Sequence, residues 1–196
     1  LFSLSSGVAR ASAGAVCGNV AVVDTQAKAY GYSTYSERWT AVSLDAQGVS
    51  RLAGDYLGFV RTPFRLYSFN STNDHWYWIN YNGEPLGEST LGATTLFWSS
   101  NAAYAIASLW TTWRTRTWEN QEQPVGGGSC GSFALVWTPL HAYAFHSASG
   151  QWMSQSMNET VAGGITCNNF GLVWTPHAVY SFDPSPGGWV PVDLGL

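Results

Sequence analysis

The sequence predicts an all-β fold, a five-bladed β-propeller built from repeats of about 37 residues. A tyrosine recurs five times, a tryptophan follows each tyrosine by nine residues, and successive tyrosines are 37, 37, 39 and 37 residues apart. The pairs are Tyr30/Trp39, Tyr67/Trp76, Tyr104/Trp113, Tyr143/Trp152 and Tyr180/Trp189. A fixed period of this size is typical of repeat architectures, so we expect residues 1–196 to form one domain.

Each repeat opens with an apolar segment that predicts two short strands joined by a tight turn. The blade anchors, which precede these segments, are Cys17, Gly54, Leu91, Cys130 and Cys167. After each anchor come a small residue, two apolar residues and then a threonine or serine that stands five residues before the tyrosine. Both faces of the first strand are apolar, as expected for a sheet covered on both sides. The small residue suits close backbone approach, so we expect this strand to be the innermost of its blade.

The second half of each repeat predicts one or two further strands. A third strand begins at the tryptophan and ends on an apolar residue five positions later. About ten polar or glycine-rich residues then precede the next anchor, enough for a short fourth strand such as residues 161–166. No stretch shows sustained helical periodicity with caps. Three or four strands per unit, repeated radially, favour a propeller over an open solenoid.

An apolar residue, usually aromatic, precedes each repeat tryptophan by seven positions. These residues are Tyr32, Phe69, Ile106, Phe145 and Phe182. The spacing resembles the kelch repeat, in which an aromatic residue, often followed by Asp-Pro, precedes a tryptophan by seven; here Phe182-Asp183-Pro184 precedes Trp189. The family's diglycine is absent, with Trp137-Thr138 and Trp174-Thr175 in its place, and the period is shorter than the roughly 50 residues of kelch. The resemblance implies a kelch-like propeller without placing the chain in the family.

The two chain ends fall on the same phase of the repeat. Phe2 lies 37 residues before Trp39, so residues 1–7 and 189–196 occupy equivalent positions. We expect these N- and C-terminal segments to share a blade and close the ring, because closure removes exposed strand edges. Two alternatives are an excerpt of a longer array and, for residues 11–13, the remnant of a signal-peptide cleavage site.

The amino-acid composition indicates where the protein is located and which classes of partner are excluded. Charged residues make up only 10% of the chain, against about 25% in typical soluble domains, and this predicts an extracellular or secreted protein. A net charge of −4 without a basic run argues against nucleic acid as a partner, and no apolar run is long enough for a membrane span. The three cysteines share one repeat column, where neighbouring sheets would hold them about 10 Å apart, beyond the roughly 7 Å limit of a disulfide. We expect buried free thiols.

The sequence predicts no catalytic site, no metal site and no cofactor. The four histidines lack metal-ligand spacing, as do the cysteines. Glycoside hydrolysis needs two carboxylates at a defined separation, and only Asp24 and Asp55 fall in the predicted first-strand segments. The chain is therefore expected not to be an enzyme.

We expect a binding site at the repeat position just before the threonine or serine, and we call the five residues at this position the column. Its members are Asp24, Arg61, Trp98, Trp137 and Trp174. An indole at this strand end could stack on a sugar while nearby hydroxyls and amides donate hydrogen bonds, and repeated weak sites gain by multivalency. Alternatively, these tryptophans pack between blades. The charges of Asp24 and Arg61 favour exposure, because unpaired charges are rarely buried.

The sequence thus predicts a non-catalytic ligand-binding propeller, lectin-like, with carbohydrate bound at repeated sites. The alternative is a kelch-like scaffold for a protein partner, or a propeller module of a larger protein. The recurring tyrosine and tryptophan are assigned to core packing. The oligomeric state is not determined by these features.

Overall fold

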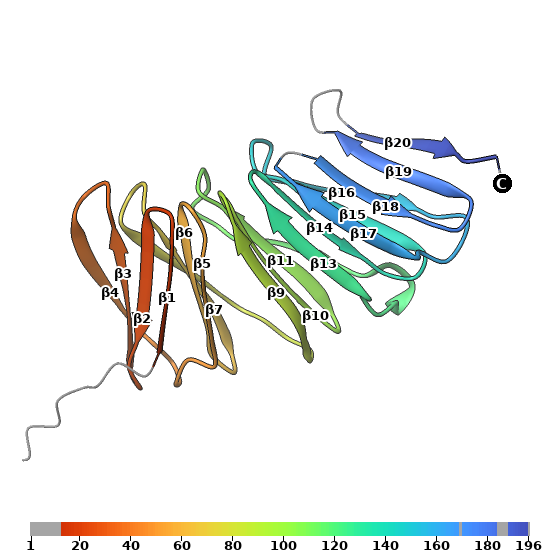
Figure 1. The fold of residues 1–196 in the computed structure, drawn as a ribbon. Coiled ribbons are helices and arrows are strands. Elements are labelled where there is room, and N and C mark those ends of the chain that lie inside the picture. Colours follow the sequence, from red (N-terminus) through yellow and green to blue (C-terminus); the bar gives the residue numbers. More distant parts are fainter. Residues whose placement is uncertain (1–12, 169, 184–187, 196) are drawn as a thin grey trace, which may run out of the picture.

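The computed structural model describes residues 13–168, 170–183 and 188–195 and contains five four-stranded antiparallel sheets (Figure 1). The first two sheets are formed by β1 (Ala13–Cys17), β2 (Val20–Asp24), β3 (Lys28–Ser33), β4 (Arg38–Ser43), and by β5 (Ser50–Ala53), β6 (Leu57–Arg61), β7 (Arg65–Asn70), β8 (His75–Asn80). The third is formed by β9 (Pro85–Leu91), β10 (Thr94–Ser99), β11 (Ala102–Ala107) and β12 (Arg114–Thr117), followed by the short helix η1 (Glu119–Gln121). The last two are formed by β13 (Gly126–Cys130), β14 (Phe133–Trp137), β15 (His141–His146), β16 (Gln151–Ser156), and by β17 (Gly163–Cys167), β18 (Phe170–Trp174), β19 (Ala178–Asp183), β20 (Gly188–Asp193). The predicted all-β architecture of five repeated sheets is confirmed.

The order of strands within each sheet differs from the expectation. The apolar segment after each anchor forms the second strand, and the segment before the anchor forms the first. The first strands of consecutive sheets contact one another far more extensively than the fourth strands do, so the sheets fan outward from β1, β5, β9, β13 and β17. The predicted fourth strand at residues 161–166 is therefore β17, the innermost strand of the next sheet. In β9, β13 and β17 the residue that faces the second-strand tryptophan is a glycine, because the indole lies over that position.

The small residue after each anchor makes room for a side chain of the preceding sheet. A methyl group added at Gly58 would lie 2.2 Å from Cγ1 of Val22, and one at Gly171 would lie 2.4 Å from Cε1 of Phe133. The column is therefore small because consecutive sheets pack closely, and the position belongs to the second strand.

The seven-residue spacing of the aromatic pair is a hairpin register. Tyr32 pairs with Trp39 across β3 and β4, and the same pairing recurs in the second, fourth and fifth sheets. Ring centroids in these pairs are 5.2 to 5.4 Å apart. The repeat tyrosine two residues earlier, such as Tyr67, lies on the same face, since side chains alternate along a strand. That face packs on the preceding sheet, where Tyr67 and Phe69 join Val20 and Val22 in one buried cluster.

The repeat threonine or serine closes the turn between the second and third strands. In all five sheets its hydroxyl oxygen accepts a hydrogen bond from the backbone N–H three residues later, at 3.0 to 3.2 Å. Small hydroxyl side chains favour such turns for this reason. The turn fixes where the second strand ends, and with it the position of the candidate column.

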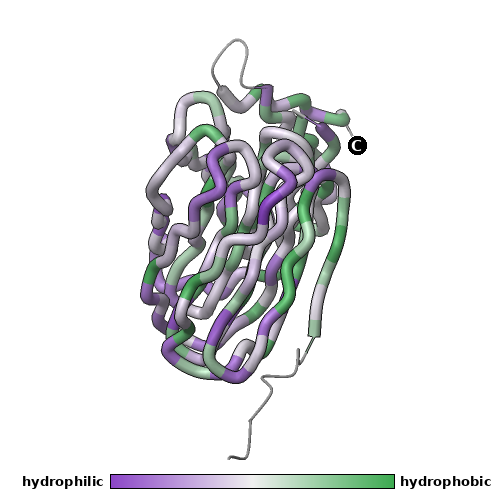
Figure 2. The backbone as a smooth tube through the Cα atoms, turned by 90° about the vertical axis from the view of Figure 1, so that its left-hand side faces the viewer, coloured by the Kyte–Doolittle hydropathy of each residue, from purple (hydrophilic) through white to green (hydrophobic). Residues whose placement is uncertain are grey.

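The first sheet and the last lie at opposite ends of the row in Figure 1, and the extensive contacts between strands of different sheets all join consecutive sheets. Figure 2 views the molecule from the side of the first sheet, with the other sheets behind it. The expected closing segment, residues 1–7, lies outside the described residues. Between these ends the sheets form an arc of five.

The cysteines are free, as expected, but they are not buried. Cys17 and Cys130 are half-buried and Cys167 is exposed. They end the inner strands β1, β13 and β17, at the turn into the second strand, where the side chain reaches the rim of the sheet.

Candidate functional site

The predicted column lies at the ends of β2, β6, β10, β14 and β18, and only its last member is exposed. Trp98 is 8% exposed and Trp174 is 37% exposed, while Trp137 is half-buried. Asp24 is fully buried and Arg61 is half-buried. Each sheet carries one of the five residues, and four of them are buried or half-buried.

The tryptophans of the column pack against glycines. In its own sheet each faces an inner-strand glycine: the pairs are Gly87/Trp98, Gly126/Trp137 and Gly163/Trp174. The next sheet supplies a second glycine. A methyl group at Gly127 would lie 3.3 Å from Cζ3 of Trp98, and one at Gly164 would lie 2.8 Å from Cε3 of Trp137. Two indoles are thus held between glycines of consecutive sheets, and Trp174 has a glycine on one side.

The charged members of the column are paired, so the expectation that their charges indicate exposure is wrong. Arg51 of the second sheet meets Asp24 with two contacts of 2.6 Å, Nε to Oδ1 and Nη2 to Oδ2. Arg61 Nε lies 2.8 Å from Oε2 of Glu88 in the third sheet. A buried charge is tolerated when it is paired and hydrogen-bonded. Both ion pairs join consecutive sheets.

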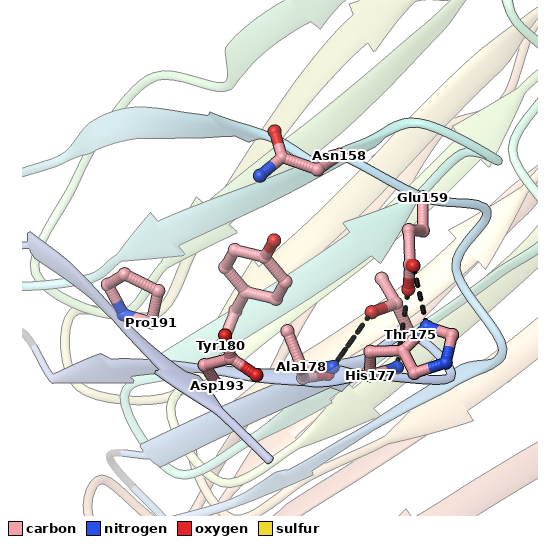
Figure 3. A pocket seen from close by; sticks show the side chains of 8 residues that line it. All are labelled: Asn158, Glu159, Thr175, His177, Ala178, Tyr180, Pro191 and Asp193. Atoms are coloured by element: carbon pink, nitrogen blue, oxygen red, sulfur yellow. Dashed lines mark hydrogen bonds and ion pairs between the residues drawn. The ribbon is translucent and has the colours of Figure 1, made fainter. Parts of the chain in front are cut away.

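A pocket of about 250 Å³ lies between the loop after β16 and the last sheet (Figure 3). Its lining residues are Asn158, Glu159, Thr175, His177, Ala178, Tyr180, Pro191 and Asp193. The ring of Tyr180 stands in the middle of this group, with the amide of Asn158 on one side and the carboxylate of Asp193 on the other. An aromatic face flanked by planar polar groups can bind a ligand that has both apolar and hydrogen-bonding surfaces.

One edge of the pocket is held by an ion pair. Nδ1 of His177 lies 2.6 Å from Oε1 of Glu159, and the backbone N–H of His177 donates to Oε2 at 3.2 Å. The hydrogen bond from His177 lowers the pKa of Glu159, against a smaller opposing effect of desolvation. Glu159 is therefore an ionised acceptor at neutral pH, which makes it a poor general acid.

A joint is the packing contact between two consecutive sheets, and in the part of the chain that the structure describes the joint that holds the pocket lacks a hydrogen bond that the other three have. In the three preceding joints the hydroxyl of the repeat tyrosine forms a hydrogen bond with the loop of the sheet before it. Tyr67 donates to Asp45 Oδ1 and Tyr104 donates to Asn82 Oδ1, both at 2.9 Å. The Tyr143 hydroxyl accepts from the backbone N–H of Glu119 at 3.0 Å. Asn158 stands at the equivalent loop position. Among the described residues, the structure shows no hydrogen bond between Tyr180 and Asn158.

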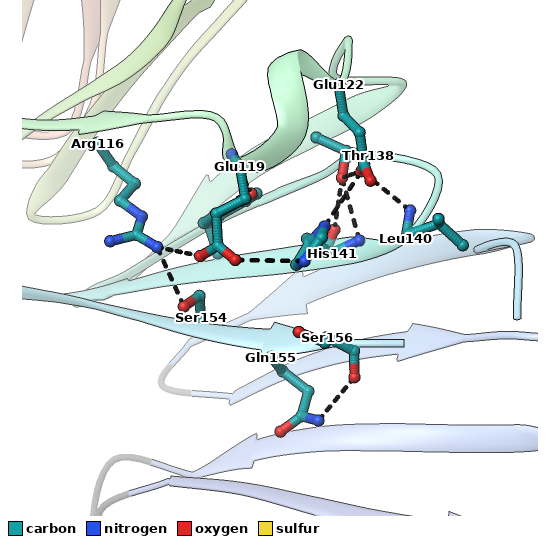
Figure 4. A network of polar contacts seen from close by, with 10 residues as sticks. Arg116, Glu119, Glu122, Thr138, Leu140, His141, Ser154, Gln155 and Ser156 are labelled. Atoms are coloured by element: carbon teal, nitrogen blue, oxygen red, sulfur yellow. Dashed lines mark hydrogen bonds and ion pairs between the residues drawn. The ribbon is translucent and has the colours of Figure 1, made fainter. Parts of the chain in front are cut away.

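Ala178 stands where the preceding sheet has His141 and where the third sheet also has an alanine, Ala102. In the preceding sheet His141 fills the joint: Nε2 lies 3.3 Å from Oε2 of Glu119, and Nδ1 lies 3.2 Å from Oε2 of Glu122 (Figure 4). Arg116 completes the network through Glu119. At the last joint a pocket takes the place of this polar network. The alanine alone does not account for it, because at the joint of Ala102 the Tyr104 hydroxyl donates to Asn82.

A second hollow of about 310 Å³ is lined by Ser100, Asn101, Trp118, Gln121 and Gln123. Its lining has no charged side chain, whereas Glu159 and Asp193 line the pocket around Tyr180, and the indole N–H of Trp118 already donates to the Ser99 carbonyl at 3.0 Å. The pocket around Tyr180 is therefore the better candidate.

Sequence reasoning missed Tyr180, Asn158 and Asp193 as site residues. Tyr180 was assigned to core packing because it recurs, and it is indeed only 5% exposed. For this tyrosine and asparagine the sequence offers no distinguishing signal, because Asn82, Ala102 and Tyr104 have the same residue types at the equivalent positions.

No protein-family model matches the chain, and no curated protein matches it. Solved structures with a similar arrangement include U3-55K (5% identity, TM-score 0.43, 85% of this chain and 58% of the other) and a chain in the crystal structure of the mitotic checkpoint complex (13%, 0.45, 93% and 63%). The computationally designed Ika8 protein is a third (8%, 0.44, 89% and 58%). The chain therefore spans about 60% of the length of each protein. These TM-scores are below 0.5, and the propeller-like fold assigned here rests on the five sheets themselves. No helix in the described part of the chain is long and apolar enough to cross a membrane.

Proposed function

We propose that this chain is a non-catalytic, lectin-like binding module and that the pocket around Tyr180 binds one carbohydrate unit. The observation that supports it is the unbonded pair of Tyr180 and Asn158 beside Asp193, in a pocket of about 250 Å³. Drug-sized ligands occupy pockets of roughly 300 to 1,000 Å³, so a space of this size suits a single small polar ring. The charge-poor composition supports an extracellular or secreted location.

The proposal replaces repeated sites with one. At the preceding joints the space is used by tyrosine hydrogen bonds and by His141, and Trp98 and Trp137 are packed between sheets. Trp174 is 37% exposed but does not line this pocket. The lowered pKa of Glu159 favours binding over acid catalysis.

A glycan array tests the proposal. The chain is produced in bacteria, so that Asn158-Glu159-Thr160, a sequon for N-linked glycosylation, stays unmodified. We expect the wild type to bind, and we expect Asn158→Ala and Asp193→Ala each to weaken binding at least tenfold, since a lost hydrogen bond to a charged or polar partner contributes about 1.5 kcal/mol.

The matched control is Asn82→Ala, which removes the equivalent side chain from a joint that is closed by Tyr104. It should leave glycan binding unchanged. A wild type that binds no glycan, or an Asn158→Ala variant that binds as well as the wild type, would contradict the proposal.

The alternative function is a scaffold for a protein partner, and exposed aromatic side chains favour it. Phe64 is 63% exposed, and Trp78 is 52% exposed with the Arg65 guanidinium 4.2 Å from its ring centroid. Exposed aromatic residues next to arginine are common at protein interfaces. If the array is negative, loss of a defined partner on Phe64→Ser and Trp78→Ser would support this alternative.

A further inference from the structure

The four joints between consecutive sheets share one register. In each, the column residue of one sheet meets the residue that stands three positions before the anchor of the next sheet. The pairs are Asp24/Arg51, Arg61/Glu88, Trp98/Gly127 and Trp137/Gly164. Each joint thus matches charge with charge or indole with glycine.

The last sheet carries one half of such a joint without its counterpart in the described part of the chain. Trp174 lies on Gly163 of its own sheet, and its other side is open. Phe170 is 43% exposed, whereas the equivalent Phe133 of the preceding sheet is fully buried against the last sheet. The outer face of the last sheet is therefore an apolar surface of the same kind that packs on another sheet elsewhere in the molecule.

The first sheet carries the other half. Gly14 is exposed and stands three positions before Cys17, the register of Gly127 and Gly164. The side chains that surround it are only half-buried: Val23, Tyr30 and Tyr32. Their equivalents in the second sheet are at most 1% exposed: Val60, Tyr67 and Phe69.

A hydrogen bond found at three of the four joints is also left open on the first sheet; at the fourth joint the Trp189 indole N–H has no partner among the described residues. Three repeat tryptophans donate their indole N–H to the fourth strand of the preceding sheet: Trp76 to the Thr40 carbonyl and Trp113 to the Tyr77 carbonyl, both at 3.4 Å, and Trp152 to the Arg114 carbonyl at 3.3 Å. Trp39 is 54% exposed, and its indole has no such partner among the described residues.

We propose that two copies of this chain associate head to tail, with the last sheet of one copy packed on the first sheet of the next. Trp174 would cover Gly14 of the next copy, and Trp39 of that copy would donate to the carbonyl of Val190, the residue that follows the last repeat tryptophan. This contact repeats a joint that the chain already forms between its own sheets. It is heterologous, so it produces a closed ring of copies or a filament.

The placement of the two faces favours a second copy over closure within one chain. The faces are complementary, and they lie at opposite ends of the arc of five sheets (Figure 1). In Figure 2 the first sheet is the end of the molecule nearest the viewer, and its outer face is the one that would contact the neighbouring copy. A neighbouring copy can meet either end without any change in the packing of consecutive sheets.

The test exchanges the open joint for one of the chain's own charged joints. Trp174→Asp and Gly14→Arg copy the Asp24/Arg51 pair, and assembly is measured by light scattering after gel filtration over a range of concentrations. We expect the wild type to reach at least twice the 21.3 kDa of one chain. Each single variant should stay at the mass of one chain.

An equimolar mixture of the two variants distinguishes association with a second copy from closure within one chain. One variant keeps the native Gly14 and the other the native Trp174, while the second contact sets the introduced aspartate against the introduced arginine. The mixture should therefore assemble again, which closure within a chain cannot reproduce. Leu109→Asp is the control, because it introduces the same charge at an exposed apolar residue in the turn between β11 and β12 of the central sheet and should leave assembly intact. Circular dichroism of each variant verifies folding.

Two results would overturn the proposal. One is a wild type that remains at the mass of one chain at every concentration, whether its ends stay open or close on each other. The other is a folded Trp174→Asp variant that assembles as the wild type does.

Discussion

The repeat tyrosine has a second role besides packing. In three joints its ring is buried and its hydroxyl bonds to the loop of the preceding sheet, at Asp45, Asn82 or Glu119. Burial raises the pKa of all three of these tyrosines. In the last sheet the same hydroxyl, on Tyr180, borders the pocket. A residue that recurs in every repeat can therefore be structural in most copies and available for binding in one.

Removal of the hydroxyl should separate the two roles. We expect Tyr104→Phe to lower the free energy of unfolding by about 1 kcal/mol, the net value of a typical hydrogen bond. Tyr180→Phe, the matched change in the last sheet, should cost close to nothing. Urea denaturation of both variants measures the difference. Equal losses in the two would mean that the Tyr180 hydroxyl is bonded in solution, and the pocket would then be closed.

At the scale of strands and loops, the sequence predicted the second, third and fourth strands of each sheet but placed the inner strand wrongly. β13 has the sequence Gly-Gly-Gly-Ser-Cys, and glycine is depleted in strands, so local preference indicates a loop. The segment is a strand because it pairs with β14, and Gly126 is a glycine because Trp137 lies over it and leaves no room for a side chain. The repeat pattern also predicted on which face of its sheet each column residue lies, but it did not predict which residue of the next sheet it contacts. That is why Asp24 was expected at the surface while Arg51 neutralises it in the interior.

The loop between β12 and β13 should make stability depend on pH. Burial acts to raise the pKa of Glu122, but hydrogen bonds from Thr138, His141 and the Leu140 N–H outweigh it and lower the pKa below its ordinary value. A carboxyl whose pKa is lower in the folded state stabilises the fold above its unfolded pKa. That contribution is lost as the pH falls through the folded pKa.

We therefore expect Glu122→Gln to reduce the free energy of unfolding at pH 7 and to flatten its decline below about pH 4.3, the ordinary pKa of glutamate. Chemical denaturation at a series of pH values measures this effect. Glu84→Gln, on an exposed turn, is the control and should follow the wild-type curve. A Glu122→Gln variant with the wild-type pH dependence would show that Glu122 is not held by this network.

At the scale of the molecule, the number of sheets was predictable and their arrangement was not. The count follows from the period, because each tyrosine marks one sheet. Curvature depends on the packing at each joint, where an ion pair such as Asp24/Arg51 and an indole on glycine such as Trp137/Gly164 fill different volumes. The repeat pattern does not indicate which kind of joint forms until the residue that each column residue contacts in the next sheet is known.

Because extensive contacts join only consecutive sheets, stability should be distributed along the row. In such arrays it is approximately a sum of unit and nearest-neighbour terms, so a sheet with two neighbours is held more strongly than a sheet with one. The central sheet, β9 to β12, should therefore show the greatest protection from amide hydrogen exchange, with β10 and β11 fully buried along their length. The first and last sheets should exchange by local opening when the chain is dilute enough to be a single copy. Mass spectrometry of peptides from the five sheets measures this order. Equal protection in all five would mean that the molecule opens only as a whole, as expected if the two end sheets were joined.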